Sequence, residues 1–130
     1  SLCSAFDLDL ALIGFPSIET EKLVRAVKKE MRLPNDGHLS VLLALGRVRF
    51  FGDEIDETWA GTQVSTTANP DVDKLELPDG RLCMIMGLGP KGLPKSFLKA
   101  SDYHFELTGS NIAFETGTAM GSIAGHLHLM

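Results

Sequence analysis

The feature that most constrains the fold is an amphipathic segment near the start of the chain. Its apolar residues recur at the offsets of one helical face, and charged residues lie between them: Leu23, Val24, Val27 and Met31. Ser17 precedes the segment as a suitable N-cap, and turn-forming residues follow it. The spacing predicts a helix over residues 18–32, with its apolar face covered by the rest of the chain.

Most of the other regular segments have the short alternating or apolar patterns of β-strands. They are residues 6–13, 47–51, 58–67, 82–86, 103–107 and 112–115, and the closing run 125–130. The apolar run 39–45 predicts a short buried helix, although a strand remains the alternative. Gly117, Gly121 and Gly125 recur every four residues, a spacing that is costly in a soluble helix, so a bent loop is expected there.

The strongest indication of two paired strands is the turn sequence Pro78-Asp79-Gly80. This turn sequence separates residues 75–77 from the apolar run 82–86, a pattern typical of a β-hairpin whose second strand is central. A second pair, 103–107 and 112–115, is expected to join at residues 109–111. We therefore predict a single globular domain over 1–130, an α+β fold with a mostly antiparallel sheet packed against the helix over 18–32 and the short helix expected over 39–45.

Composition supports a globular domain and excludes two classes of protein. The 130 residues are 44% hydrophobic with a formal charge of −5, which is too apolar for a disordered chain. No run of about 20 apolar residues could span a membrane. Because the chain starts at Ser1 and ends on a strand-like run, we expect a trimmed core of a longer chain. Cys3 and Cys83 are expected to be free thiols, since two distant cysteines make no disulfide framework.

One motif resembles a nucleotide-binding loop. Residues 87–92 read G-x-G-x-x-G and follow a predicted strand. A phosphate-binding turn must lead into a helix with free amide groups, but Pro90 and Pro94 lack these donors. Only 36 residues follow Pro94, which is too few for half of a doubly wound fold. The pattern therefore does not predict a dinucleotide site.

Two ladders of polar residues are possible metal ligands: His126 with His128, and Asp102 with His104 and Glu106. Each ladder would project to one face of a strand, but solvated strand faces show the same alternation. Cys83 lies among apolar residues, where burial disfavours a reactive thiolate. We therefore predict no catalytic residues, no metal site and no cofactor.

The clearest charge feature is the polar face of the first helix. It gathers five basic residues: Lys22, Arg25, Lys28, Lys29 and Arg32. A second candidate surface interleaves lysines with apolar residues: Lys91, Leu93, Lys95, Phe97 and Lys99. By contrast, residues 53–79 carry eight acids and one base. The basic surfaces are predicted to bind lipid headgroups, nucleic-acid phosphates or an acidic patch on another copy.

The order of elements resembles the globular core of rhabdovirus-type matrix proteins. The resemblance rests on segments 6–13, 17–32 and 39–46 and on the glycine-containing run Ile123-x-Gly125-x-Leu127-x-Leu129. It implies a non-enzymatic protein that self-assembles into homo-oligomers and bridges an anionic membrane surface and a viral nucleoprotein. It also implies a peripheral location beneath the virion envelope and in the host cytoplasm, without sequence-specific nucleic-acid binding.

A different class of function remains open beside the matrix resemblance. This alternative is a small ligand-binding or hydrolytic α+β domain. Its acidic cleft would draw on residues 53–79 and on His104, His126 or His128.

Overall fold

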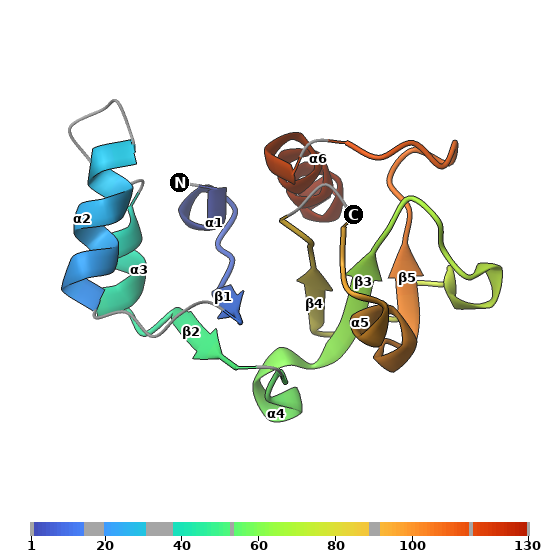
Figure 1. The fold of residues 1–130 in the computed structure, drawn as a ribbon, viewed down its shortest axis with the longest axis horizontal. Coiled ribbons are helices and arrows are strands. Elements are labelled where there is room, and N and C mark those ends of the chain that lie inside the picture. Colours follow the sequence, from blue (N-terminus) through green and yellow to red (C-terminus); the bar gives the residue numbers. More distant parts are fainter. Residues whose placement is uncertain are drawn as a thin grey trace. The chain divides into compact units, whose positions relative to one another are not determined.

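The computed structural model describes residues 2–14, 20–30, 38–52, 54–88, 92–114 and 116–129. The chain divides into two compact units, residues 1–55 and residues 56–130. Each unit has its own parallel sheet, drawn as arrows in Figure 1.

The first unit pairs two short strands in parallel. Its elements are α1 (Leu2–Ala5), β1 (Leu10–Ile13), α2 (Thr20–Glu30), α3 (Leu39–Ala44) and β2 (Val48–Phe51). The register runs from Leu10 opposite Val48 to Ile13 opposite Phe51. The predicted helix 18–32 is confirmed over α2 and the predicted short helix 39–45 over α3, whereas the predicted strand 6–13 is confirmed only over β1.

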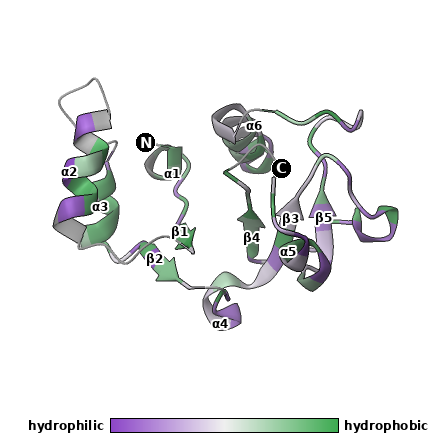
Figure 2. Ribbon diagram, viewed as in Figure 1, coloured by the Kyte–Doolittle hydropathy of each residue, from purple (hydrophilic) through white to green (hydrophobic). Residues whose placement is uncertain are grey.

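The core of this unit forms between the helices and the strands. Leu39, Leu42 and Val48 are buried at its centre. Partly buried apolar residues pack around them: Cys3, Leu10, Leu23, Val24, Val27 and Leu43. Figure 2 shows hydrophilic and hydrophobic residues alternating along α2, as expected for a helix with one covered face. The predicted apolar stripe of the first helix therefore supplies part of the core.

Arg47 links the segment before β1 to the start of β2 in the first unit. The Nε atom of Arg47, just before β2, donates to Asp9 Oδ1 at 2.6 Å, and a second nitrogen donates to the Asp7 carboxylate. A further Arg47 nitrogen donates to the Asp7 carbonyl oxygen at 2.9 Å. Because Asp7 and Asp9 directly precede β1, these contacts hold the starts of the two parallel strands in register.

The second unit carries a three-stranded sheet in the order β4-β3-β5. Its elements are α4 (Glu57–Ala60), β3 (Thr62–Thr66), the 3-10 helix η1 (Val72–Lys74), β4 (Leu82–Ile85), α5 (Lys95–Ala100), β5 (Tyr103–Phe105) and α6 (Thr116–Leu129). Both strand pairs are parallel, so all three strands end at the same edge of the sheet. In Figure 1 the three arrows point the same way.

The predicted antiparallel sheet is therefore wrong, although the protein does combine helices and strands in an α+β fold. Residues 75–77 form no strand, and the predicted hairpin does not exist. Residues 67–81, including η1, instead cross from the end of β3 back to the start of β4, as parallel neighbours require. β4 is also an edge strand in the sheet, not the central one.

The closing segment is a helix, so the predicted strand over 125–130 and the bent loop before it are both wrong. Gly117, Gly121 and Gly125 all lie within α6. The helix buries Ile123 and Ala124, and nothing lies within 4 Å of the side-chain positions of Gly121 and Gly125. Packing of one face outweighs the low helix propensity of the glycines. The predicted strand 112–115 is likewise irregular over 112–114.

α5, which the sequence did not predict, is held on the sheet by buried polar contacts at its carboxyl end. Ser65 and Ser101 are fully buried with their hydroxyl oxygens 2.5 Å apart, and the Ser65 hydroxyl also donates to the Phe97 carbonyl oxygen at 3.2 Å. The ammonium group of Lys74 donates to the Ser101 carbonyl oxygen at 2.9 Å. The Phe97 carbonyl oxygen also accepts the Ser101 backbone N–H at 3.0 Å, so it takes a second donor at the helix end.

Candidate functional site

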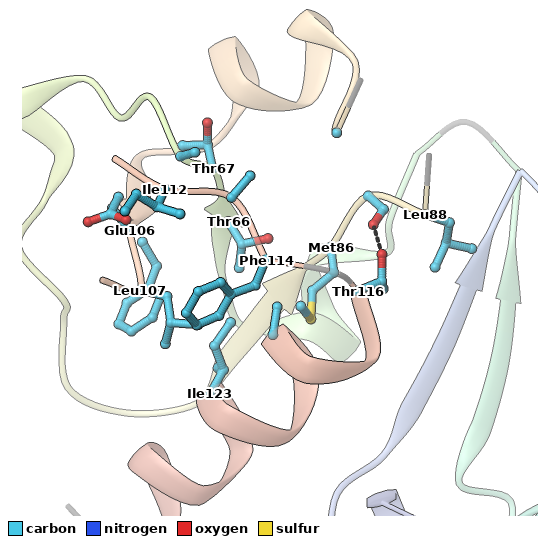
Figure 3. Close-up of a pocket in the computed structure, with 16 residues that line it drawn as sticks. Thr66, Thr67, Met86, Leu88, Glu106, Leu107, Ile112, Phe114, Thr116 and Ile123 are labelled. Atoms are coloured by element: carbon cyan, nitrogen blue, oxygen red, sulfur yellow. Dashed lines mark hydrogen bonds between the residues drawn. The ribbon is translucent and has the colours of Figure 1, made fainter. Parts of the chain in front are cut away.

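A pocket of about 470 Å³ opens in the second unit. Its lining is mostly apolar, with three threonines and one carboxylate (Figure 3). The lining residues are Thr66, Thr67, Ala68, Met86, Gly87, Leu88, Gly92, Phe105, Glu106, Leu107, Ile112, Ala113, Phe114, Thr116, Ala119 and Ile123. This volume is within the usual range for sites that bind small organic molecules.

The pocket lies at the carboxyl edge of the parallel sheet. Residues 66–68 end and follow β3, residues 86–88 follow β4, and residues 105–107 end and follow β5. All three strands therefore contribute to one wall. Open parallel sheets characteristically bind ligands outside the carboxyl ends of their strands, because the loops there diverge and leave a crevice.

The apolar side chains divide into a buried floor and an exposed mouth. Ile123 of α6 is only 4% exposed and forms part of the floor, whereas Phe114 and Ile112 are 47% and 57% exposed. Figure 3 shows the Phe114 ring between Met86 on one side and Leu107 on the other. Large apolar groups left open to solvent around a concavity mark a surface that gains from being covered.

Two threonine hydroxyls at the pocket are already engaged by the backbone. Thr66 donates to the Ile85 carbonyl oxygen at 2.8 Å, which joins the ends of β3 and β4. Thr116 donates to the Gly87 carbonyl oxygen at 3.2 Å, the dashed line in Figure 3. The two bonds fix the pocket wall that the loop after β4 forms.

Glu106 is the one charged side chain among the lining residues that the structure describes. Its carboxylate accepts the Thr108 hydroxyl at 2.8 Å, the Thr108 backbone N–H at 3.0 Å and the Gly109 N–H. These hydrogen bonds, the Thr108 hydroxyl first, lower the pKa of Glu106 because they favour the charged form. The pocket therefore presents a fixed negative charge at neutral pH.

Gly87 permits the close turn at the pocket wall. A β-carbon on this residue would lie 2.5 Å from the Gly92 carbonyl carbon and 2.7 Å from the Leu93 nitrogen. Both neighbours are backbone atoms, which cannot move aside cheaply. Only glycine fits where the segment after β4 folds back on itself.

None of the described residues of the predicted basic surfaces lines this pocket. On α2 of the first unit, Lys22, Arg25 and Lys29 are exposed, while the Lys28 side chain and Arg32 lie outside the described residues. In the second unit, Lys95 and Lys99 of α5 are exposed, Leu93 and Phe97 are half-buried, and Lys91 lies outside the described residues. The two groups belong to different units, and their binding role stays a prediction.

The histidines do not form the ladders that the sequence suggested. His104 is buried, and its Nδ1 accepts the Asp71 backbone N–H at 3.0 Å while its Nε2 lies 2.8 Å from the Leu98 carbonyl oxygen. Nε2 must then donate, so both ring nitrogens are occupied by structural bonds. His126 and His128 are exposed on α6, not on a strand. Across the described residues, no group of three metal-ligating side chains comes together.

Both cysteines are free thiols in the described structure, as expected. Partial burial raises the pKa of both the Cys83 thiol and the Cys3 thiol. Neither cysteine lines the pocket. The low reactivity predicted for Cys83 agrees with this partial burial.

Comparison with known proteins points away from viruses. No family model and no solved structure matches the chain. It is similar to an archaeal protein. The chain is 29% identical over 130 residues to Uncharacterized protein MJ0224 of Methanocaldococcus jannaschii. The aligned region covers 94% of this chain and 74% of that protein.

This similarity corrects the sequence-based identification. The resemblance to rhabdovirus-type matrix proteins is wrong, and so is the viral matrix function of bridging membrane and nucleocapsid. The expected lack of enzymatic activity and the expected self-association stay predictions. None of the helices in the described ranges has the length and apolar content to cross a membrane.

The pocket was not predicted from the sequence, and its lining differs from the acidic cleft suggested there as an alternative. Of the described residues 54–79, only Thr66, Thr67 and Ala68 line the pocket, and none of the acids in that range does. The available signal was a polar or glycine residue within two positions of a strand's end, such as Gly87 after β4 and Glu106 after β5. This signal does not indicate a shared site when the strands are assigned as antiparallel, because the carboxyl ends of neighbouring strands then lie at opposite edges of the sheet.

Proposed function

We propose that residues 56–130 form a domain that binds a small organic molecule in the pocket at the carboxyl edge of its parallel sheet. The single observation that supports this most is the shared origin of the wall. Residues from the ends of β3, β4 and β5 line one cavity, which is the usual place of ligand sites in open parallel sheets.

The lining indicates the general chemistry of such a ligand. Phe105, Leu107, Phe114 and Ile123 provide apolar contact for a hydrophobic part of the molecule. Covering the half-exposed Phe114 and the more exposed Ile112 would remove apolar surface from water, which favours binding. The threonines and the loop backbone can orient polar groups of the ligand.

A filling substitution tests the proposal on the full chain. Ala119 lines the pocket from α6, so Ala119→Phe would occupy part of its volume. We expect this variant to weaken binding of the uncharged fluorescent dye N-phenyl-1-naphthylamine by about tenfold or more, since the ligand and the new ring compete for one space.

Ser122→Phe is the matched control, because Ser122 is exposed on the same helix and does not line the pocket. It adds the same ring, and we expect it to bind the dye as the parent protein does. Equal dye binding by the parent and both variants, or no dye binding by the parent, would contradict the proposed pocket.

A further inference from the structure

The charge and the aromatic rings of the pocket narrow its ligand class. Glu106 brings a carboxylate, and Phe105 and Phe114 bring two phenyl rings. The Phe105 ring also lies against the His126 ring, with centroids 6.2 Å apart. The faces of such rings carry partial negative charge and attract cations, most strongly where water is excluded. In Figure 3, Glu106 lies on the side of the pocket opposite Thr116, and Phe114 lies between them.

No Lys, Arg or His appears among the described lining residues. An anionic ligand placed here would lose hydration and meet a carboxylate in place of a cation. The second unit as a whole has nine acidic and five basic residues, a formal balance of −4, which favours the approach of cations.

From these features we infer that the pocket takes an organic cation: an alkylated or aryl ammonium group carried on an apolar body. This inference rests on the proposed function of the same pocket. The apolar body lies against Ile123 and Leu107, and the positive group lies near Glu106 and the ring of Phe114. A carboxylate with aromatic neighbours is a common way to hold quaternary ammonium groups.

A matched pair of probes tests the charge preference. (3-Hydroxyphenyl)trimethylammonium and 3-tert-butylphenol have nearly the same shape and differ by one positive charge. We expect the cation to bind the full chain about tenfold more tightly, as measured by displacement of N-phenyl-1-naphthylamine. The anion 3-hydroxybenzoate should bind most weakly of the three.

Two substitutions assign the preference to named side chains. Glu106→Gln should remove most of the difference between cation and uncharged probe while leaving the uncharged probe within about twofold. Phe114→Leu keeps an apolar side chain and should lower the preference about threefold through loss of the ring face. Asp102→Asn is the control, since it removes the same charge from an exposed residue outside the lining.

The outcomes separate this inference from the proposed function. If the uncharged probe or the anion binds as tightly as the cation, or if Asp102→Asn acts like Glu106→Gln, the charge preference is overturned while the pocket stands. If no probe displaces the dye and Ala119→Phe changes nothing, the pocket itself is overturned. A preference lost only in Glu106→Gln and reduced in Phe114→Leu supports the inference.

Discussion

Thr116 donates its hydroxyl hydrogen to the carbonyl oxygen of Gly87 across 3.2 Å. The bond joins the first turn of α6 to the segment after β4, two parts of the chain that are far apart in sequence. Both residues line the pocket. The position of α6 over the carboxyl edge of the sheet therefore depends in part on one side-chain contact.

Removing this hydroxyl should loosen the pocket. Thr116→Val keeps the shape of the side chain but leaves the Gly87 carbonyl oxygen without this donor, and we expect a loss of about 1 kcal/mol in the free energy of unfolding. Urea titration followed by circular dichroism measures the change. Thr116→Ser retains the hydroxyl and should lose less than Thr116→Val. Equal stability of the valine and parent proteins would show that the bond contributes nothing.

Substitution of Gly87 and of Gly121 by alanine should change the free energy of unfolding in opposite directions. Gly87→Ala places a β-carbon 2.5 Å from the backbone of Gly92, so we expect destabilisation of about 1–3 kcal/mol and weaker dye binding. Gly121→Ala lies in α6 with nothing within 4 Å of the new carbon and should stabilise the helix by about 0.5–1 kcal/mol. Urea midpoints of both variants check this, and destabilisation by both would contradict the described packing.

The sequence predicted local elements better than their pairing. The apolar stripe through Leu23 and Val27 was enough to place α2, because a helix needs only its own periodicity and caps. Pro78-Asp79-Gly80 predicted a turn equally well, but a turn does not determine which strand the following residues join. β4 pairs with β3 across the whole segment 67–81, a long-range choice that local chemistry does not encode.

The closing helix was missed for a different physical reason. α6 is apolar or small nearly all round, so it lacks the amphipathic period that revealed α2. Its glycines lower intrinsic helix propensity, and only the packing of Ile123 and Ala124 compensates. The pocket was missed for a further reason. Its location follows from the parallel order of β4, β3 and β5 and not from a residue motif.

Acid should weaken the second unit through Glu106. The hydrogen bonds from Thr108 and Gly109 lower the pKa of this carboxyl in the folded protein, whereas in the unfolded chain it returns to its ordinary value of about 4.3. The resulting stability is fully present above about pH 4.3 and is lost as the pH falls through the lower, folded pKa. Glu106→Gln should lack this contribution, so the gap between its urea midpoint and that of the parent should be constant from pH 7 to pH 5 and shrink below pH 4.

A second variant separates the Thr108 contact from the charge of Glu106 itself. Thr108→Ala removes the hydroxyl that lowers the pKa of Glu106 most, while the backbone N–H bonds remain. Its stability gap to the parent should therefore also narrow in acid, by less than that of Glu106→Gln. The same titration should reduce cation binding, since a protonated Glu106 offers no negative charge to the ligand. Parallel pH profiles for the parent and Glu106→Gln between pH 5 and pH 3 would show that the carboxylate bonds do not stabilise the fold.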